Sequence, residues 1–168
     1  MSPSPSTSQG DSGFSSLPGL PNLPKSHVLF EALGAIDETN ASLGLLLASL
    51  PPHSRPDWIP SAQRHLLSIG AEIASASPRL PPDAVDSLSR VLAALDDSLP
   101  PANGFSIPGN NEPSARAHVA RATCRRAERA CILAREFHPD RASPRAAAFL
   151  NRLSSLLFSF ARSLENPP

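Results

Sequence analysis

The sequence predicts an all-α protein, a bundle of five helices in one domain. Apolar residues recur at intervals of three and four along five separate segments, which is the spacing of one buried helix face. The chain has 20 prolines among 168 residues, and most of them lie between these segments or at their ends. No segment shows the alternation of apolar and polar residues that is typical of a strand. A chain of this length can bury a sizeable core.

Three helices are predicted in the first hundred residues. The first begins at about residue 27 and ends before Pro51, with a stripe of Val28, Leu29, Ala32, Leu33, Ile36, Leu43, Leu46 and Leu47. The second covers about 61–76, after a proline-rich loop that carries Trp58, and its inward residues are Leu66, Leu67, Ile69, Ile73 and Ala74. The third covers about 83–99, with Val85, Leu88, Val91, Leu92 and Leu95 on its apolar face.

Two more helices follow a loop over 100–113. The fourth covers about 114–137 and has Val119, Ala122, Ile132 and Leu133 as its apolar residues, and the fifth covers about 144–164. Pro144 suits the first turn of that helix. Residues 1–26 are rich in Ser, Pro and Gly, so we expect a flexible, extended or disordered N-terminal segment followed by a helical domain over 27–168.

Composition argues against several classes of function. The net charge is +0 and aromatic residues make up 5% of the chain, so a nucleic-acid partner is not expected. No apolar run reaches the roughly 20 residues that span a bilayer. If Cys124 and Cys131 share a helix, they lie about 10 Å apart, too far for a disulfide, which favours two buried thiols in a reducing compartment.

The segment R-A-T-C-R-R-A-E-R over 121–129 is the strongest functional signal. It places Arg121, Arg125 and Arg129 at i, i+4 and i+8 on one helix face. Stacked guanidinium groups repel one another unless an anion faces them, and arginine binds phosphate and carboxylate oxygens in pairs. The stripe therefore predicts a polyphosphate ligand or a buried acidic partner. The alternative is a solvated basic face.

Several segments match one family in the same order and at compatible spacing, over nearly the whole chain. They are G-D-S-G-F-S-S-L (10–17), F-E-A-L-G-A-I-D-E-T-N (30–40), S-I-G-A-E-I-A (68–74), F-S-I-P-G (105–109), H-V-A-R-A-T-C-R-R-A-E-R (118–129) and F-L-N-R-L-S (149–154). On these segments the chain resembles the ATP:cob(I)alamin adenosyltransferases, the corrinoid adenosyltransferases with a ferritin-like five-helix bundle.

The resemblance implies an enzyme, a homotrimer with active sites between adjacent subunits. Its substrates would be ATP with Mg²⁺ and a cob(II)alamin that is reduced to cob(I)alamin. Co(I) would attack the 5′ carbon of ATP, giving adenosylcobalamin and triphosphate. A reductase and an adenosylcobalamin-dependent mutase are the implied protein partners.

The resemblance also assigns site residues. ATP would be bound by Thr7, Ser8, Gln9, Gly10, Asp11, Gly13, Ser15, Ser16, Lys25, Arg125, Arg126, Glu128, Arg129 and Asn151. Asp37 would pair with Arg121, and both, together with Phe105, would bind the corrinoid. These three and Arg125 are the implied catalytic residues. No direct protein site for a metal is implied, although Glu128 could lie near the Mg²⁺ of ATP.

Each of these residues also has a purely structural interpretation. Lys25 could be an ordinary surface lysine, and Glu128 could form a pair on the helix surface. Asn151 could be a buried structural amide, Phe105 could fill a core, and Asp37 with Asn40 could line an exposed helix edge.

Departures from the family pattern leave two other functions open. Ser8 and Gln9 occupy positions where the family has a basic residue and Thr, and Ser155 replaces an acid. A degenerate, non-catalytic homologue that binds or delivers corrinoid is therefore the second hypothesis, and a generic helical interaction protein is the third. Because the chain starts close to the proposed ATP loop, we expect an intracellular, cytoplasmic protein. A mitochondrial location applies if the source is eukaryotic and the N-terminus incomplete.

Overall fold

The computed structural model describes residues 10–101 and 107–165. Its elements are the strands β1 (Phe14–Leu17) and β2 (Leu20–Pro24), the helices α1 (Val28–Ser49), α2 (Trp58–Ser75), α3 (Ala84–Asp97), α4 (Glu112–Phe137) and α5 (Pro144–Glu165), and the 3-10 turn η2 (Pro52–Ser54). The five long helices confirm the predicted all-α bundle.

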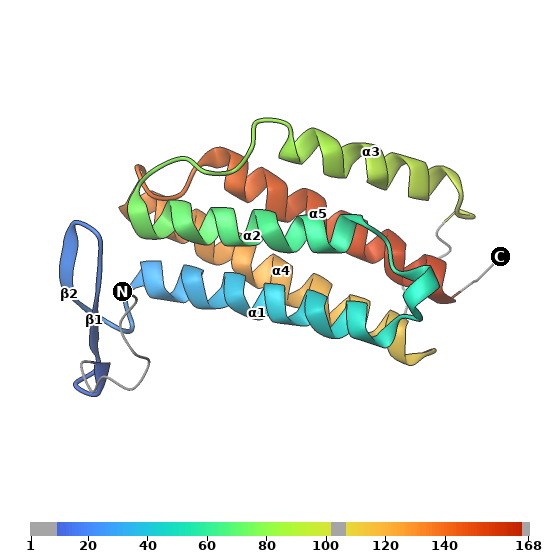
Figure 1. Ribbon diagram of the computed structural model, residues 1–168, viewed down its shortest axis with the longest axis horizontal. Helices are drawn as coiled ribbons and strands as arrows, with labels where there is room; N and C mark the ends of the chain where they lie inside the picture. Colours follow the sequence, from blue (N-terminus) through green and yellow to red (C-terminus); the bar gives the residue numbers. More distant parts are fainter. Residues whose placement is uncertain (1–9, 102–106, 166–168) are drawn as a thin grey trace.

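Four of the helices, α1, α2, α4 and α5, lie side by side along the long axis of the molecule (Figure 1). The closest packing joins α4 to α5 and α1 to α4. Helix α3 packs mainly on α5 and touches α2 only marginally. The core between the helices is aliphatic, with Leu29, Ile36, Leu66, Ile69 and Phe149 among the side chains that are fully buried.

The inner face of α4 consists of small residues. Its buried positions include Ala117, Ala120, Cys124, Ala127, Cys131 and Ala134. The larger residues Val119, Ile132 and Leu133 were predicted to form its apolar face, but all three are exposed. The reason is packing distance, because α4 lies against both α1 and α5 and only short side chains fit between them.

Helix α2 also differs from the prediction. It begins at Trp58, three residues early, because Pro60 falls within the first turn, where a proline does not remove a helical hydrogen bond. Its buried stripe runs through Ile59, Ala62, Leu66, Ile69 and Ile73. Leu67 was predicted to point inward, but it follows Leu66 by about 100° around the helix and is 60% exposed.

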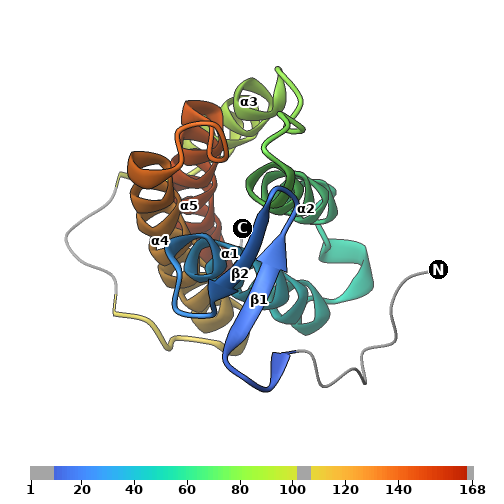
Figure 2. The same cartoon turned by 90° about the vertical axis from the view of Figure 1, so that its left-hand side faces the viewer.

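A β-hairpin precedes the bundle and lies across the end at which α1 begins (Figure 2). Strands β1 and β2 are antiparallel, with Phe14 opposite Pro24 and Leu17 opposite Leu20. The expectation of a disordered segment is wrong for residues 14–24, where two extended strands pair although the sequence shows no alternation typical of a strand. The turn is made by Pro18 and Gly19, whose φ of 76° is one that glycine adopts without strain.

Contacts with the bundle explain why this short hairpin forms. Leu17, Leu20 and Leu23 are partly buried against the core. The guanidinium of Arg141, in the connection between α4 and α5, donates a 2.6 Å hydrogen bond to the carbonyl oxygen of Pro18. Two isolated strands are marginal in water, so these tertiary contacts, which no local pattern encodes, stabilise the hairpin.

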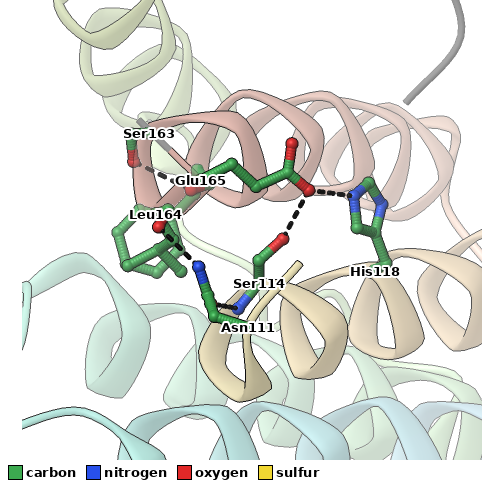
Figure 3. A network of polar contacts seen from close by, with 7 residues as sticks. Asn111, Ser114, His118, Ser163, Leu164 and Glu165 are labelled. Atoms are coloured by element: carbon green, nitrogen blue, oxygen red, sulfur yellow. Dashed lines mark hydrogen bonds and ion pairs between the residues drawn. The ribbon is translucent and has the colours of Figure 1, made fainter. Parts of the chain in front are cut away.

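A polar network ties the start of α4 to the end of α5 (Figure 3). Asn111 caps α4 by accepting from the Ser114 N–H at 2.8 Å, and its amide donates to the Leu164 carbonyl at 2.8 Å. The Ser114 hydroxyl donates to Glu165 at 2.7 Å, and His118 Nε2 lies 3.6 Å from the same carboxylate oxygen. This network fixes the turn of α4 that leads to the arginine stripe.

We expect Asn111→Ala to lower the free energy of unfolding by about 1–3 kcal/mol, because it removes a helix cap and a second hydrogen bond. The measurement is urea unfolding at fixed protein concentration, followed by the fluorescence of Trp58, the only tryptophan. The matched control is Asn110→Ala, which changes an exposed neighbour outside the network. Equal stabilities of the two variants would contradict the role assigned to Asn111.

Candidate functional site

A cavity of about 720 Å³ opens between α3, α4 and α5. Its charged lining consists of Arg121, Arg125 and Arg162, and of one carboxylate, that of Asp96. That carboxylate already accepts a 2.5 Å hydrogen bond from Ser159. The cavity therefore carries excess positive charge and is suited to an anionic ligand.

Arg121 is held against an aromatic ring inside the cavity. Its guanidinium carbon lies 5.9 Å from the centroid of the Phe158 ring, a cation–π distance. Its Nε atom is buried with no hydrogen-bond partner among the described residues. Such an unpaired donor is costly unless a ligand or water completes it. For Arg121, the structure contradicts the alternative of a fully solvated basic face, whereas Arg125 lines the same cavity with its side chain exposed.

Arg129, the third arginine of the stripe, faces a different side of α4. Together with Arg126, Ala122 and Thr123 it lines a shallow groove of about 220 Å³. Arg126 also forms an ion pair with Glu38 of α1, and both side chains are about half exposed. The stripe is therefore divided, with Arg121 and Arg125 in the cavity and Arg129 on the outer surface beside Arg126.

Glu128 and Asn151 lie together at the junction of α4 and α5. The Asn151 amide donates to Glu128 Oε1 at 3.0 Å. Asn151 is exposed, so the alternative of a buried structural amide is wrong. The pairing also contradicts a surface pair of Glu128 with a residue of its own helix turn. Both side chains remain available at the edge of the arginine helix.

Asp37 does not meet Arg121 within the chain. Asp37 is exposed on α1, and it forms no ion pair within residues 10–101 and 107–165. Its neighbour Glu38 is the α1 carboxylate that contacts α4. Arg121 instead points into the cavity beside α5. The implied Asp37–Arg121 pair would therefore have to join two chains.

The glycine loop and Lys25 lie close together at the base of the hairpin. The Gly13 N–H donates to the Gly10 carbonyl at 3.3 Å, and the Lys25 N–H donates to the Gly13 carbonyl at 2.8 Å. The Lys25 ammonium lies directly over Gly10, where an added Cβ would be 2.9 Å from Nζ. Asp11 is exposed at the turn. This arrangement suits the binding of an anion by backbone N–H groups and one cation.

Two hydroxyls lie along the same hairpin. Ser15 is paired with Leu23 in the ladder, and the Ser16 hydroxyl accepts from the Asn22 N–H at 3.1 Å. Four other predicted site residues, Thr7, Ser8, Gln9 and Phe105, lie outside the described residues.

The loop and the cavity lie towards opposite ends of the bundle (Figure 1). The hairpin stands beyond the start of α1. The cavity is lined by residues from the last turns of α3, such as Asp96, and by α5 as far as Arg162. A single chain thus presents two cationic surfaces that are separated along its long axis.

Sequence reasoning missed two buried charged residues near the hairpin. Arg141 is 6% exposed, and Glu72 is 3% exposed. The Glu72 carboxylate accepts from the Ser143 N–H at 2.9 Å and from the Arg79 N–H at 3.2 Å. Arg141 falls in an irregular connection where no periodicity applies, so the sequence carries no signal for it. Phe158 was missed because it resembles any other apolar residue of α5.

The two cysteines are buried and free, as predicted. Burial, together with the nearby Glu72 and Glu128 charges, raises the pKa of the Cys131 thiol to about 12. Burial also raises the pKa of Cys124, whose thiol donates to the Leu150 carbonyl at 3.2 Å. Both groups are therefore neutral thiols at physiological pH and are not candidate nucleophiles.

Among the described residues, no helix is long and apolar enough to cross a membrane.

Comparison with known proteins gives one consistent result. The family model described as "Cobalamin adenosyltransferase" matches residues 5–164. A corrinoid adenosyltransferase of Mycobacterium leprae is 33% identical over 93% of this chain and 88% of its own length. A cobalamin adenosyltransferase of Cupriavidus metallidurans is 35% identical over 94% of this chain and 86% of its own length.

Solved structures share the fold. A variant PduO-type ATP:corrinoid adenosyltransferase of Lactobacillus reuteri, complexed with cobalamin and ATP, superposes with a TM-score of 0.87 at 23% identity, covering 96% of this chain and 91% of that one. A second variant of that type from the same organism, complexed with ATP, gives a TM-score of 0.83 at 24% identity, over 95% and 93% of the two chains.

We expect neither cysteine to react with a thiol reagent such as Ellman's reagent at pH 8 while the protein is folded. The thiolate is the reactive form, and with a pKa of about 12 only roughly one Cys131 side chain in ten thousand is ionised at that pH. Absorbance at 412 nm should report no thiols in the native protein and both in denaturant. Rapid reaction of the native protein would contradict the assigned burial.

Proposed function

Since this chain belongs to the cobalamin adenosyltransferase family, we propose that it transfers the 5′-deoxyadenosyl group of ATP to the cobalt of a reduced corrinoid. The main structural support is that Arg121 and Arg125 line one cavity with excess positive charge. A ligand with several negative charges satisfies these groups, and a triphosphate is such a ligand.

The reaction needs alignment more than acid–base chemistry. The lone pair of Co(I) forms a bond to C5′ of ATP, the C5′–O bond breaks, and triphosphate leaves with the bonding electrons. Cobalt is thereby oxidised to Co(III), and no proton moves in this step. The protein contributes by holding the nucleophile in line with the leaving oxygen and by stabilising the charge that develops on the triphosphate.

In this proposal the arginines of α4 bind the triphosphate. Arg125 projects into the cavity, while Arg126 and Arg129 line the adjoining side of the same helix. Glu128, held by Asn151, orients these cations or lies near the Mg²⁺ of ATP.

The apolar part of the cavity suits the corrinoid. Leu92, Leu99 and Phe158 line it, and Pro101 begins the connection that leads to Phe105. A corrin ring is broad and largely apolar, so these side chains would cover its face. Phe105, by the family resemblance, would exclude the lower axial base, which makes cobalt easier to reduce.

We assign the glycine loop to the triphosphate of a neighbouring chain. Gly10, Gly13 and Lys25 form a compact cationic turn, but it stands at the far end of the bundle from the cavity of the same chain. A homotrimer with sites between adjacent subunits brings the turn of one chain to the arginines of the next. The same arrangement would allow Asp37 to pair with Arg121 across the interface.

The chemistry also defines the cellular partners. A reductase must supply Co(I), and an adenosylcobalamin-dependent mutase is the kind of enzyme that uses the product. Both ATP and a strong reductant belong to the interior of a cell or the mitochondrial matrix, where two free cysteines are stable.

One observation favours a second candidate function. Ser8 and Gln9 replace a basic residue and a threonine at the start of the proposed ATP loop. A chain with a weakened ATP loop could bind or deliver a corrinoid without catalysis. Calorimetry separates the two functions, because the enzyme binds both ATP and corrinoid, whereas the carrier binds corrinoid alone.

The proposed enzyme should convert ATP and chemically reduced cob(I)alamin to adenosylcobalamin and triphosphate, followed by the absorbance change of the corrinoid. We expect Arg125→Ala to lower kcat/KM by about a hundredfold or more, because a cation next to the leaving group is lost. Arg64→Ala removes an exposed arginine of α2 and serves as the control, with activity unchanged. No product from the wild-type protein at saturating ATP would end the proposal.

Ser8→Lys should tighten ATP binding by about tenfold or more, since it restores a cation to the start of the loop. The dissociation constant from calorimetry is the readout, and Ser8→Gln, which adds length without charge, is the matched control. Equal affinities of the two variants would show that this position does not face a phosphate.

A further inference from the structure

Arg141 connects three segments that are distant in the sequence. Its side chain is 6% exposed, and Nη1 donates to the carbonyl oxygens of Ala74 at 2.7 Å and Ile73 at 3.3 Å. Its Nη2 atom donates to the Pro18 carbonyl at 2.6 Å. One buried guanidinium thus joins the end of α2, the connection between α4 and α5, and the tip of the hairpin.

The site that holds Arg141 is built for a cation. Helix α2 ends at Ser75, so the carbonyls of Ile73 and Ala74 belong to the last turn, where they lack helical partners and carry partial negative charge. The Glu72 carboxylate fixes the connection itself by accepting from the Ser143 N–H at 2.9 Å. The guanidinium is therefore held in place by the bundle through Nη1, and its Nη2 group is directed at the hairpin.

The base of the hairpin is closed by contacts within the segment itself. The Lys25 N–H donates to the Gly13 carbonyl, and the Lys25 ammonium lies over Gly10. Beyond Lys25 the chain enters α1 directly. With its base joined to α1 and its tip joined to Arg141, the hairpin holds the glycine loop at one position relative to the bundle.

We propose that Arg141 is a positioning residue that locks the ATP-binding hairpin in place, and this inference rests on the proposed function. Arg141 touches neither substrate. It acts through the Pro18 carbonyl, because a hairpin released at its tip can pivot about the start of α1 and carry the glycine loop away from the triphosphate. The expected defect is in ATP binding, with corrinoid binding unchanged.

The chain offers a probe of the hairpin that does not depend on activity. Lys25 is its only lysine, so a lysine-specific endoprotease can cut the protein only after the hairpin. Cleavage at an ordered site requires local opening, and its rate follows the population of the open form. We expect Arg141→Gln to be cleaved about tenfold faster than the wild type, while Arg145→Gln, an exposed arginine nearby, is cleaved at the wild-type rate.

Steady-state kinetics should distinguish a positioning role of Arg141 from a general loss of structure. Arg141→Gln should raise the KM for ATP by about tenfold while kcat at saturating ATP and the KM for cob(I)alamin stay close to wild type. Wild-type cleavage at Lys25 or a wild-type KM for ATP in this variant would overturn the proposal.

A second variant covers the case in which Arg141→Gln fails to fold. Gly19→Val perturbs the same contact from the hairpin side, because the φ of 76° disfavours a branched residue and strains the turn next to Pro18. The space itself is not the obstacle, since a Cβ at this position would lie 3.5 Å from Arg141 Nη2, an ordinary contact distance. It should reproduce faster cleavage and the higher KM. If both variants fold, the double variant should be no worse than either one, and full additivity would overturn the shared contact.

Different results would refute the proposed function and the proposed role of Arg141. A wild-type protein that yields no adenosylcobalamin refutes the function, whereas an active wild type whose Arg141→Gln and Gly19→Val variants keep its KM for ATP refutes only the role of Arg141.

Discussion

Positive charge on α4 is the constraint on which the proposed chemistry of this bundle depends. The cavity between α3, α4 and α5 has Arg121 and Arg125 of α4 in its lining and one carboxylate, that of Asp96, which is already bonded to Ser159. Like charges that line one cavity repel one another, and the buried Nε of Arg121 lacks a hydrogen-bond partner among the described residues. In the proposed function, a polyanionic substrate would remove this repulsion when it binds.

The glycine loop and the arginine cavity do not meet within one chain. The glycine loop with Lys25 and the cavity lie towards opposite ends of the bundle, and Asp37 forms no ion pair with Arg121 among the described residues. If both surfaces bind the same nucleotide, as we propose, they must come from adjacent subunits. A substrate bound there would be enclosed by helices on one side and by the hairpin on the other.

Helices and their order could be predicted because periodicity and proline positions are local signals. The shared placement of Arg121 and Arg125 could be predicted because residues four apart lie on one helix face. The inner face of α4 could not, since it depends on how closely α1 and α5 approach, and small Ala and Cys residues look neutral in a hydrophobic pattern. The hairpin was missed because its stability comes from Arg141, which lies 123 residues from its acceptor Pro18. Long-range pairing of this kind leaves no trace in composition.

The row of small residues along α4 has a consequence for how this protein can change over time. The spacing of three helices depends on small side chains at four buried positions, Ala117, Ala120, Ala127 and Ala134. A larger side chain at any of them would push apart the helices that align the cations. Substitutions by larger residues are therefore not tolerated on that side of the helix. Substitution remains possible on the outward side, where Val119 and Leu133 contact no core and can be exchanged to suit a new neighbour.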